Sequence, residues 1–277
     1  SSALFAACMA GGAGGAAVGT MSLELAAGPP PSAVLEGALP TICLIGATGA
    51  GKSSTGNTLF GSRDSAVFHV SDEANPASVT ARTSVEVRRW RGTGCWVRCV
   101  DSPGLGDSEG RDPEHIASMS EAFRREVGYV HAFLVLFNGQ EPRLQAHLKE
   151  MLGIFKGMFG EAFQRHVLIG FTRWEYDRKA RLKRKRLGGT EEQRAQAINQ
   201  ELQKLLGHDF DCPCVFFDNT LNMCDDDELL ELFDDELPAI TQQFESELGK
   251  VFQFAQNQEP FFCKDIVTVT TEKEELR

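Results

Sequence analysis

Residues 46 to 53 combine the residue types that bind the phosphates of a nucleotide. Their sequence, GATGAGKS, fits the spacing G-x-x-x-x-G-K-[ST] at every fixed position. Glycines let successive backbone N–H groups turn toward one anion. Lys52 is placed to reach the β- and γ-phosphates, and the Ser53 hydroxyl is a ligand for Mg²⁺. The predicted phosphate contacts are Gly46, Ala47, Thr48, Gly49, Ala50, Gly51, Lys52, Ser53 and Ser54.

A second polar element, Val100-Asp101-Ser102-Pro103-Gly104, follows further along the chain. Asp101 is expected to hold Mg²⁺ through water, and the N–H of Gly104 to sense the γ-phosphate. A polar loop at 61–82 separates the two elements and is expected to give the metal another hydroxyl. Thr80 is the candidate, and Thr83 is its rival.

The phosphate motif needs a buried strand before it and a helix after it. The apolar run 41–45 predicts that strand, and a helix should run from Lys52 to about Phe60. Further strands are predicted at 84–91, 95–101, 132–137, 166–171 and 214–217, and further helices at 113–127, 144–159 and 226–254, the last kinked or restarted at Pro238.

Strands that alternate with helices predict an α/β fold, the doubly wound P-loop NTPase type. We expect a mostly parallel six-stranded sheet with one antiparallel hairpin strand, flanked by helices. Residues 1–37 are rich in Ala, Gly and Pro and are predicted to be a flexible tail, with Met21 a possible natural start. One nucleotide-binding domain should occupy 38–257, followed by a tail at 258–277.

The phosphate motif and the residues after it, Ser53-Ser54-Thr55-Gly56-Asn57-Thr58-Leu59-Phe60-Gly61, resemble those of the immunity-associated nucleotide-binding proteins, the GIMAP group of AIG-type GTPases. This family is related to septins and to the chloroplast import (Toc) GTPases. The segment from Val100 to Leu105 resembles the family's second phosphate motif, and the resemblance covers roughly residues 39–255. It implies GTP or GDP with Mg²⁺ as ligands.

The resemblance implies that Phe171 to Asp177 recognises guanine. A guanine edge carries two donors, which favours a carboxylate acceptor. Thr172-Arg173-Trp174-Glu175 fits the Asn-Lys-x-Asp frame with Glu175 as the carboxylate, and Asp177 competes for the role. An adenine site has no need of this carboxylate, which favours GTP over ATP. Asp218-Asn219 resembles the family's Asn-Asn element on the other side of the base.

Hydrolysis is expected to be slow. Ras-type proteins orient water with a Gln after the Asp-x-x-Gly motif, where this chain has Leu105. Some family members dimerise across the nucleotide face and supply an arginine after the fourth core strand. This chain has Asn138-Gly139-Gln140 there, so we expect Gln140 or Arg143, with Lys52, to assist hydrolysis in a dimer or oligomer. Two alternatives stay open: a GTP-loaded scaffold with negligible catalysis, and a P-loop ATPase or kinase.

The composition is that of an ordinary globular protein, with 42% hydrophobic and 24% charged residues. A net charge of −11 argues against nucleic-acid binding. The eight cysteines are scattered; Cys212 and Cys214 form the one close pair, too few for a zinc site. Reduced thiols and the absence of a long apolar run predict a cytoplasmic protein without a transmembrane segment.

A dense basic run at 178–186 contrasts with acidic runs at 225–228 and 234–236. The basic run is expected to be a solvated helix face, with peripheral contact to an anionic membrane or a nuclear localisation signal as the sharper alternatives. The acidic runs fit helix N-termini, where negative charge is favourable. His131 and His166 border apolar strands and are expected to be structural.

Overall fold

The computed structural model describes residues 39–61, 67–68, 83–102, 113–141, 146–187, 189–207, 211–219 and 235–266. Within them, six strands form one sheet: β1 (Thr41–Gly46), β2 (Ser84–Arg89), β3 (Trp96–Asp101), β5 (Ala132–Asn138), β6 (Val167–Thr172) and β7 (Cys214–Phe216). Their order is β2-β3-β1-β5-β6-β7, and only β2 is antiparallel to its neighbour. The predicted six-stranded sheet with one antiparallel hairpin strand is confirmed.

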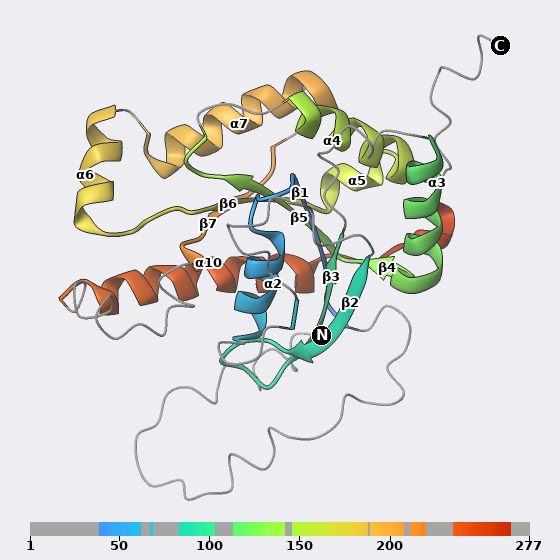
Figure 1. Ribbon diagram of the computed structural model, residues 1–277, viewed down its shortest axis with the longest axis horizontal. Coiled ribbons are helices and arrows are strands. Elements are labelled where there is room, and N and C mark those ends of the chain that lie inside the picture. The colour runs from blue at the N-terminus through green and yellow to red at the C-terminus, as the bar shows by residue number, and fades with distance from the viewer. Residues whose placement is uncertain are drawn as a thin grey trace, which may run out of the picture.

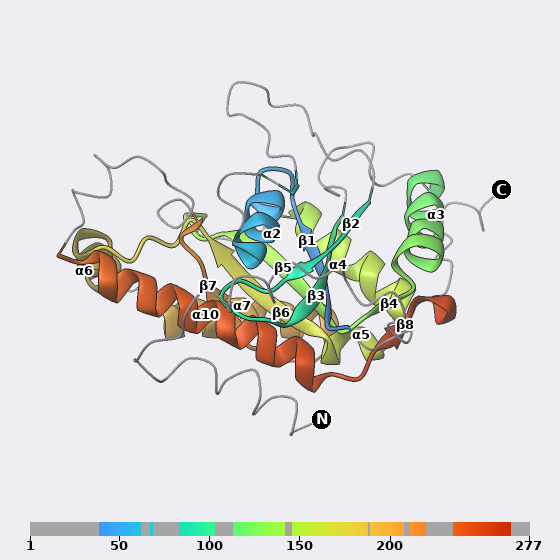
Figure 2. The ribbon, with the colours of Figure 1, turned by 90° about the horizontal axis from the view of Figure 1, so that it is seen from below.

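Helices cover both faces of the sheet (Figure 1). They are α2 (Lys52–Phe60), α3 (Pro113–Ala122) with a π-helical turn at Phe123–Val127, α4 (Ala146–Phe159), α5 (Ala162–Arg165), α6 (Arg178–Leu187), α7 (Glu191–Leu206) and α10 (Leu237–Asn257). Helix α6 lies at one end of the molecule and α3 at the other in both views (Figures 1 and 2).

Alternation along the central strands separates two apolar cores. Cys43, Phe133 and Ile169 point to one face and pack with residues of α4, α5 and α7. Leu44 and Leu134 point to the other face and pack against α2 and α10. Successive side chains of a strand face opposite sides of a sheet, so these continuous apolar runs are buried on both sides. This is why the runs at 41–45 and 132–137 predicted central strands correctly.

The strand order determines where a ligand can bind. From β1 the chain passes first to β2 and β3 on one side, and later to β5 on the other side of β1. In open α/β sheets the crevice at such a reversal, outside the carboxyl ends of the strands, is the usual binding site. The segment 46–51, directly after β1, lies at this point.

Helix α7 is absent from the sequence prediction. Its N-terminus is a capping box, in which Thr190 accepts a hydrogen bond from the Gln193 N–H and the Gln193 side chain accepts one from the Thr190 N–H. A Thr followed three residues later by Gln is a helix-start pattern, so the signal was present. The last helix begins at Leu237 with Pro238 in its first turn. Pro238 therefore starts a helix and does not kink one, as Pro is tolerated there.

Part of the segment assigned to the C-terminal tail packs onto the domain. Strand β8 (Phe261–Phe262) pairs antiparallel with β4 (Tyr129–Val130) in a separate two-stranded sheet. Cys263 and Ile266, which follow it, are buried in the core that contains α4. The ordered unit therefore reaches at least Ile266. Among the helices that the structure describes, none combines the length and apolarity needed to cross a bilayer.

Candidate functional site

The loop between β1 and α2 has the backbone that phosphate binding requires. Gly49 and Gly51 adopt positive φ angles of 77° and 87°, which side-chain-bearing residues rarely tolerate. A Cβ at Gly46 would lie 2.7 Å from the Leu136 carbonyl oxygen of β5. The three glycines of the motif are thus needed for chain direction and for close packing, and the loop leads into the N-terminus of α2, where N–H groups are available to an anion.

Lys52 folds back over this loop. Its Nζ donates hydrogen bonds to the carbonyl oxygens of Gly46 (3.1 Å) and Ala47 (3.0 Å). The residue is 7% exposed. The ammonium group is therefore held beside the loop that is predicted to enclose the phosphates, with no long rearrangement needed to reach them.

Ser53 and Asp101 meet at the carboxyl ends of β1 and β3. The Ser53 Oγ donates to Asp101 Oδ2 at 2.8 Å. Burial raises the pKa of the Asp101 carboxyl, while the Ser53 hydrogen bond and the Lys52 charge oppose that rise. Within the described part of the chain, Asp101 Oδ1 is buried without a hydrogen-bond partner. A hydroxyl beside a carboxylate with a spare oxygen is a donor set that fits hydrated Mg²⁺.

Thr172, predicted as a nucleotide contact, is 1% exposed and supports the phosphate loop from beneath. Its Oγ1 lies 2.8 Å from the carbonyl oxygen of Ala50 and 3.1 Å from that of Phe137. Its methyl group is 3.3 Å from the position of a Cβ on Gly51. Thr172 thereby joins the end of β6 to the loop after β1, so the structure gives it a positioning role.

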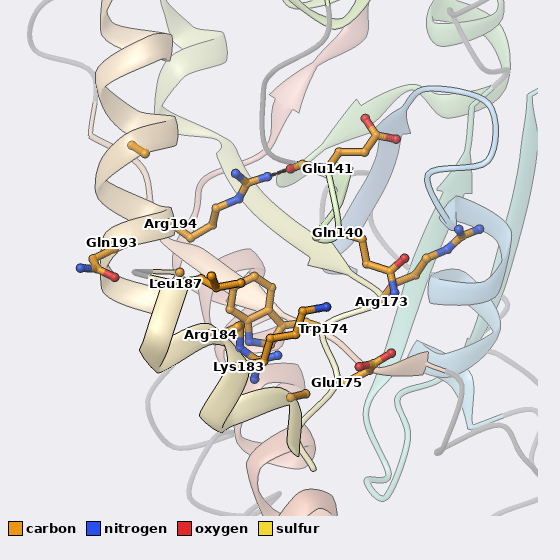
Figure 3. A pocket seen from close by; sticks show the side chains of 14 residues that line it. Gln140, Glu141, Arg173, Trp174, Glu175, Lys183, Arg184, Leu187, Gln193 and Arg194 are labelled. Atoms are coloured by element: carbon orange, nitrogen blue, oxygen red, sulfur yellow. Dashed lines mark hydrogen bonds between the residues drawn. The ribbon is translucent and has the colours of Figure 1, made fainter. Parts of the chain in front are cut away.

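The loop after β6 divides its side chains between two directions. Arg173, at φ 55°, and Glu175 are exposed, whereas Trp174 is 4% exposed. Figure 3 shows Trp174 pointing toward α6 while Arg173 and Glu175 extend to the side of α2. The Trp174 N–H donates to the Phe217 carbonyl oxygen at 2.8 Å, which joins this loop to the segment after β7.

Asp177, the alternative to Glu175 as the guanine-binding carboxylate, caps a helix. Its Oδ1 accepts a hydrogen bond from the Ala180 N–H at 3.0 Å, so it caps the first turn of α6. Glu175 is the carboxylate of the pair that remains exposed on the side of α2. Of the two carboxylates, the geometry therefore favours Glu175 as the one that would contact a guanine base.

Asp218 and Asn219 lie after β7 and are 2% and 9% exposed. The Asn219 Nδ2 donates to Thr55 Oγ1 of α2 at 2.9 Å. Its Oδ1 is buried without a hydrogen-bond partner among the residues that the structure describes. The contact from Thr55 fixes the segment after β7 against the helix of the phosphate loop, a relation that the sequence analysis missed because the two residues are distant in sequence.

Trp174, in the loop after β6, is packed in a cluster of aromatic and charged side chains. Trp174 packs on Phe216 with ring centroids 4.7 Å apart and donates from Nε1 to Glu191 Oε1 at 3.3 Å. The Arg184 guanidinium lies 4.5 Å from the centre of the Trp174 ring. Trp174 and Arg184 line a cavity of about 660 Å³ between the loops after β5 and β6 and helices α6 and α7 (Figure 3).

Glu247 of α10, another residue missed from the sequence, is fully buried and accepts a hydrogen bond from the Phe216 N–H at 3.1 Å. It thereby satisfies a backbone donor of β7, the edge strand, two residues before Asp218. A glutamate within the apolar stripe of the last helix was the available signal, because a buried carboxylate needs a donor.

Gln140, predicted to assist hydrolysis, is exposed on the loop after β5, beside the loop that carries Arg173. The Gly139 N–H donates to the Thr172 carbonyl oxygen at 2.7 Å and holds the two loops together. Thr83 precedes β2 and is half-buried. Thr80, Gly104, Leu105 and Arg143 lie outside the described residues.

The sheet order, the phosphate loop and the Ser53–Asp101 pair define the class: this is the fold of a P-loop NTPase. The chain belongs to the AIG1 family, whose model matches residues 40–254. This agrees with the resemblance on which the sequence analysis relied.

One curated relative is immune-associated nucleotide-binding protein 7 of Arabidopsis thaliana, 27% identical over 139 residues. The match covers 47% of this chain and 40% of the relative's length. Toc33 of Arabidopsis thaliana in complex with GDP and Mg²⁺ has a TM-score of 0.55 at 17% identity, covering 80% of this chain and 87% of that one. A dimerization-deficient mutant of Toc33 has a TM-score of 0.55 at 18% identity, covering 79% and 86%. At these identities, the structural likeness establishes the fold.

Proposed function

We propose that this chain binds GTP and GDP with Mg²⁺ and hydrolyses GTP slowly, with a change of conformation or self-assembly that depends on the nucleotide. The observation that carries the proposal is the junction at the carboxyl ends of β1 and β3. There a complete phosphate loop meets the Ser53–Asp101 pair, 2.8 Å apart, with one carboxylate oxygen still unpartnered in the described part of the chain.

Each residue has a defined part in this proposal. Backbone N–H groups of residues 46–54 surround the phosphates, and Lys52 neutralises charge on the β- and γ-phosphates. Ser53, Asp101 and Thr80 would hold Mg²⁺, which neutralises charge on the phosphate oxygens when bound. The Gly104 N–H would contact the γ-phosphate, so its loop would rearrange when that phosphate leaves.

At the other end of the nucleotide, Glu175 would accept the two donors of the guanine edge. Arg173, Asp218 and Asn219 complete the proposed base contacts. The exposed position of Glu175 on the side of α2 and the capping role of Asp177 support this assignment. A carboxylate here would repel the acceptor atoms of adenine, which disfavours an ATPase or kinase.

Slow hydrolysis rests on what stands at the catalytic positions. Leu105 occupies the place where Ras-type proteins orient water with Gln. Gln140 is exposed beside the loop that carries Arg173. It would act across a dimer interface, with Arg143 as the second candidate. The existence of a dimerization-deficient Toc33 mutant supports a dimeric state for this fold.

The test combines single-turnover phosphate release with mass in solution. Release per protein should rise with protein concentration, and Gln140→Ala should lower the concentrated rate by about tenfold while leaving the dilute rate unchanged. The mass should differ between GDP and a non-hydrolysable GTP analogue. Equal rates at dilute and concentrated protein would reject assisted hydrolysis, and a constant mass would reject nucleotide-driven assembly.

A GTP-loaded scaffold is the second candidate, favoured by Leu105 and by the absence of the family's arginine near Gln140. It requires the same nucleotide site but no turnover. A mass that changes with the GTP analogue, together with no phosphate release at any protein concentration, would select the scaffold over the GTPase.

A further inference from the structure

Helix α6 places most of its surface in solvent. Of its residues 178–187, only Ala180 is buried and only Arg184 is half-buried. Six cations are exposed, and so is Leu182 at 49%. Among the described large apolar side chains, only Leu182 (49%), Leu187 (74%) and Leu205 (36%) are exposed, and two of the three belong to α6.

The outward face of α6 has a specific pattern. Leu182 is surrounded on the helix by its i−4, i−3, i+3 and i+4 neighbours, which share its side of the helix. All four are exposed cations: Arg178, Lys179, Lys185 and Arg186. Ala180 and Arg184 are four residues apart and face the protein on the opposite side. The outward face is therefore a leucine inside a ring of positive charge.

The helix is held so that this face points away from the domain. Asp177 caps its first turn, and the Arg178 N–H donates to Glu236 Oε2 at 2.6 Å. On the inward side, Arg184 stacks on Trp174 at 4.5 Å. In both views α6 forms one extremity of the molecule (Figures 1 and 2). Within the described part of the chain, the outward side chains of α6 are exposed and could meet an approaching surface.

The exposed cations of α6 have no ion-pair partner within 4.0 Å among the residues that the structure describes. Elsewhere, cations such as Lys149 and Lys204 do pair, both with Glu201. This basic surface lies on a chain of net charge −11, so it is a local feature and not a general property of the composition.

We propose that α6 docks on the surface of a membrane that contains anionic lipids. Leu182 enters the boundary between headgroups and acyl chains, while Arg178, Lys179, Lys185 and Arg186 remain at the headgroup phosphates. Long basic side chains suit this arrangement because their stems cover apolar surface while their charged ends stay in water. Both apolar burial and charge attraction contribute to such binding.

The central leucine distinguishes a bilayer from a polynucleotide. A phosphate backbone satisfies the cations but offers no apolar medium to a leucine at the centre of the contact. This docking uses residues outside the nucleotide site and does not depend on the proposed function.

The experiment is co-sedimentation of the full chain with phosphatidylcholine vesicles, with and without phosphatidylserine. We expect binding only when phosphatidylserine is present, and release by added salt. Leu182→Gln should weaken partitioning by about tenfold. The pair Lys185→Glu and Arg186→Glu should weaken it by about 25-fold or more, from about fivefold for each basic residue.

Matched controls separate the face from general effects. Leu205→Gln removes an exposed leucine of α7, and the pair Arg125→Glu and Lys204→Glu changes the net charge equally on other helices. Circular dichroism and GDP affinity should be unchanged in every variant, and the controls should bind vesicles as the parent does.

Three results would overturn the proposal. One is equal binding to vesicles with and without phosphatidylserine, or to neither. Another is an unchanged Leu182→Gln variant, which would leave a contact of charge alone and remove the inserted leucine. The third is binding to single-stranded RNA at a salt concentration where vesicles are not bound, which would make the helix a nucleic-acid contact.

Discussion

At the phosphate end of the candidate site the side chains are buried, whereas the base end combines two exposed side chains, Arg173 and Glu175, with the buried pair Asp218 and Asn219. At the phosphate end, Lys52, Asp101 and Thr172 are 7%, 2% and 1% exposed, and each is hydrogen-bonded to the loop or to its neighbour. At the base end, Arg173 and Glu175 are exposed and only Trp174 between them is buried.

Because of this difference, we expect the phosphate end to determine the affinity for nucleotides and the base end to determine the preference among them. We expect the loop after β1 to bind any nucleoside phosphate with little loss of conformational entropy, because its conformation is fixed by glycine geometry and by Thr172. In the proposed function, recognition of guanine depends on the exposed Arg173 and Glu175, in the loop that Trp174 joins to Phe217, and on the buried Asp218 and Asn219. Mutations at the phosphate end should therefore weaken all nucleotides alike, and mutations at the base end should alter the preference among them.

Lys52→Ala should have the largest effect. Loss of the buried ammonium group should lower the affinity for GDP by about a hundredfold or more, because the close charge pair between Lys52 and the phosphates is lost. The affinity for ADP should fall by the same factor. Titration with fluorescent nucleotides measures this, with Lys204→Ala on the surface of α7 as the matched control. Undiminished GDP binding would show that the loop after β1 does not hold the phosphates.

Glu175→Ala should affect the base end alone. GDP affinity should fall by about tenfold to a hundredfold, since hydrogen bonds to charged groups contribute about 1.5–3 kcal/mol. ADP affinity should not fall, because the carboxylate that repels the acceptor atoms of adenine is removed. Asp177→Asn is the control: it should slightly destabilise α6 through its cap but retain the preference for guanine. If Asp177→Asn abolished that preference and Glu175→Ala did not, the assignment of the two carboxylates would be reversed.

Asp101 gives the phosphate end a dependence on pH. Its pKa in the folded chain is raised by burial, so the folded state favours the protonated form and this contribution to stability is lost as pH rises through that pKa. Mg²⁺ requires the ionised form. As the pH is lowered, the affinity of Mg²⁺ for the GDP complex should therefore begin to fall at a higher pH than it would with a carboxylate of ordinary pKa.

Asp101→Asn should remove this pH dependence and weaken Mg²⁺ binding by about tenfold. Magnesium titrations of the GDP complex at several pH values measure both effects, and GDP binding without metal is the reference. A parent and variant with the same Mg²⁺ affinity would exclude Asp101 from the metal site.

Thr172→Val should have the smallest effect on binding. It preserves shape but leaves the Ala50 carbonyl without its hydroxyl partner, at a cost of about 1 kcal/mol in the free energy of unfolding. GDP and ADP affinities should fall together by a few-fold as the loop loosens. Thr58→Val, which removes a hydroxyl bonded within α2, is the control and should lower stability without altering binding.

The sequence predicted the strand, loop and helix that carry the phosphate motif because the information for them is contiguous. A glycine spacing, a lysine and a hydroxyl define the loop within eight residues, from Gly46 to Ser53. The apolar strands on both sides predicted the sheet for the same reason, since alternation and length are local properties. The hydrogen bond of Thr172 to this loop could not be predicted locally, because the two are distant in sequence.

The base end was less predictable because tertiary contacts decide it. Glu175 and Asp177 are both carboxylates in the same short segment of sequence, and only the cap that Asp177 forms on α6 distinguishes them. Asn219 is tied to Thr55, and the β7 edge to Glu247, by pairings that no local pattern contains. Pairing of Phe261–Phe262 with Tyr129–Val130 is likewise a long-range contact, which a scan of local periodicity cannot detect.

The most direct test of the account compares GDP with ADP on the unmodified chain in the presence of Mg²⁺. Calorimetric titration should give a dissociation constant for GDP at least about a hundredfold below that for ADP, as expected when a site is built to hydrogen-bond one base edge. Equal affinity for the two nucleotides would contradict the assignment of Glu175 and with it the guanine specificity. Failure to bind either would contradict the phosphate loop itself.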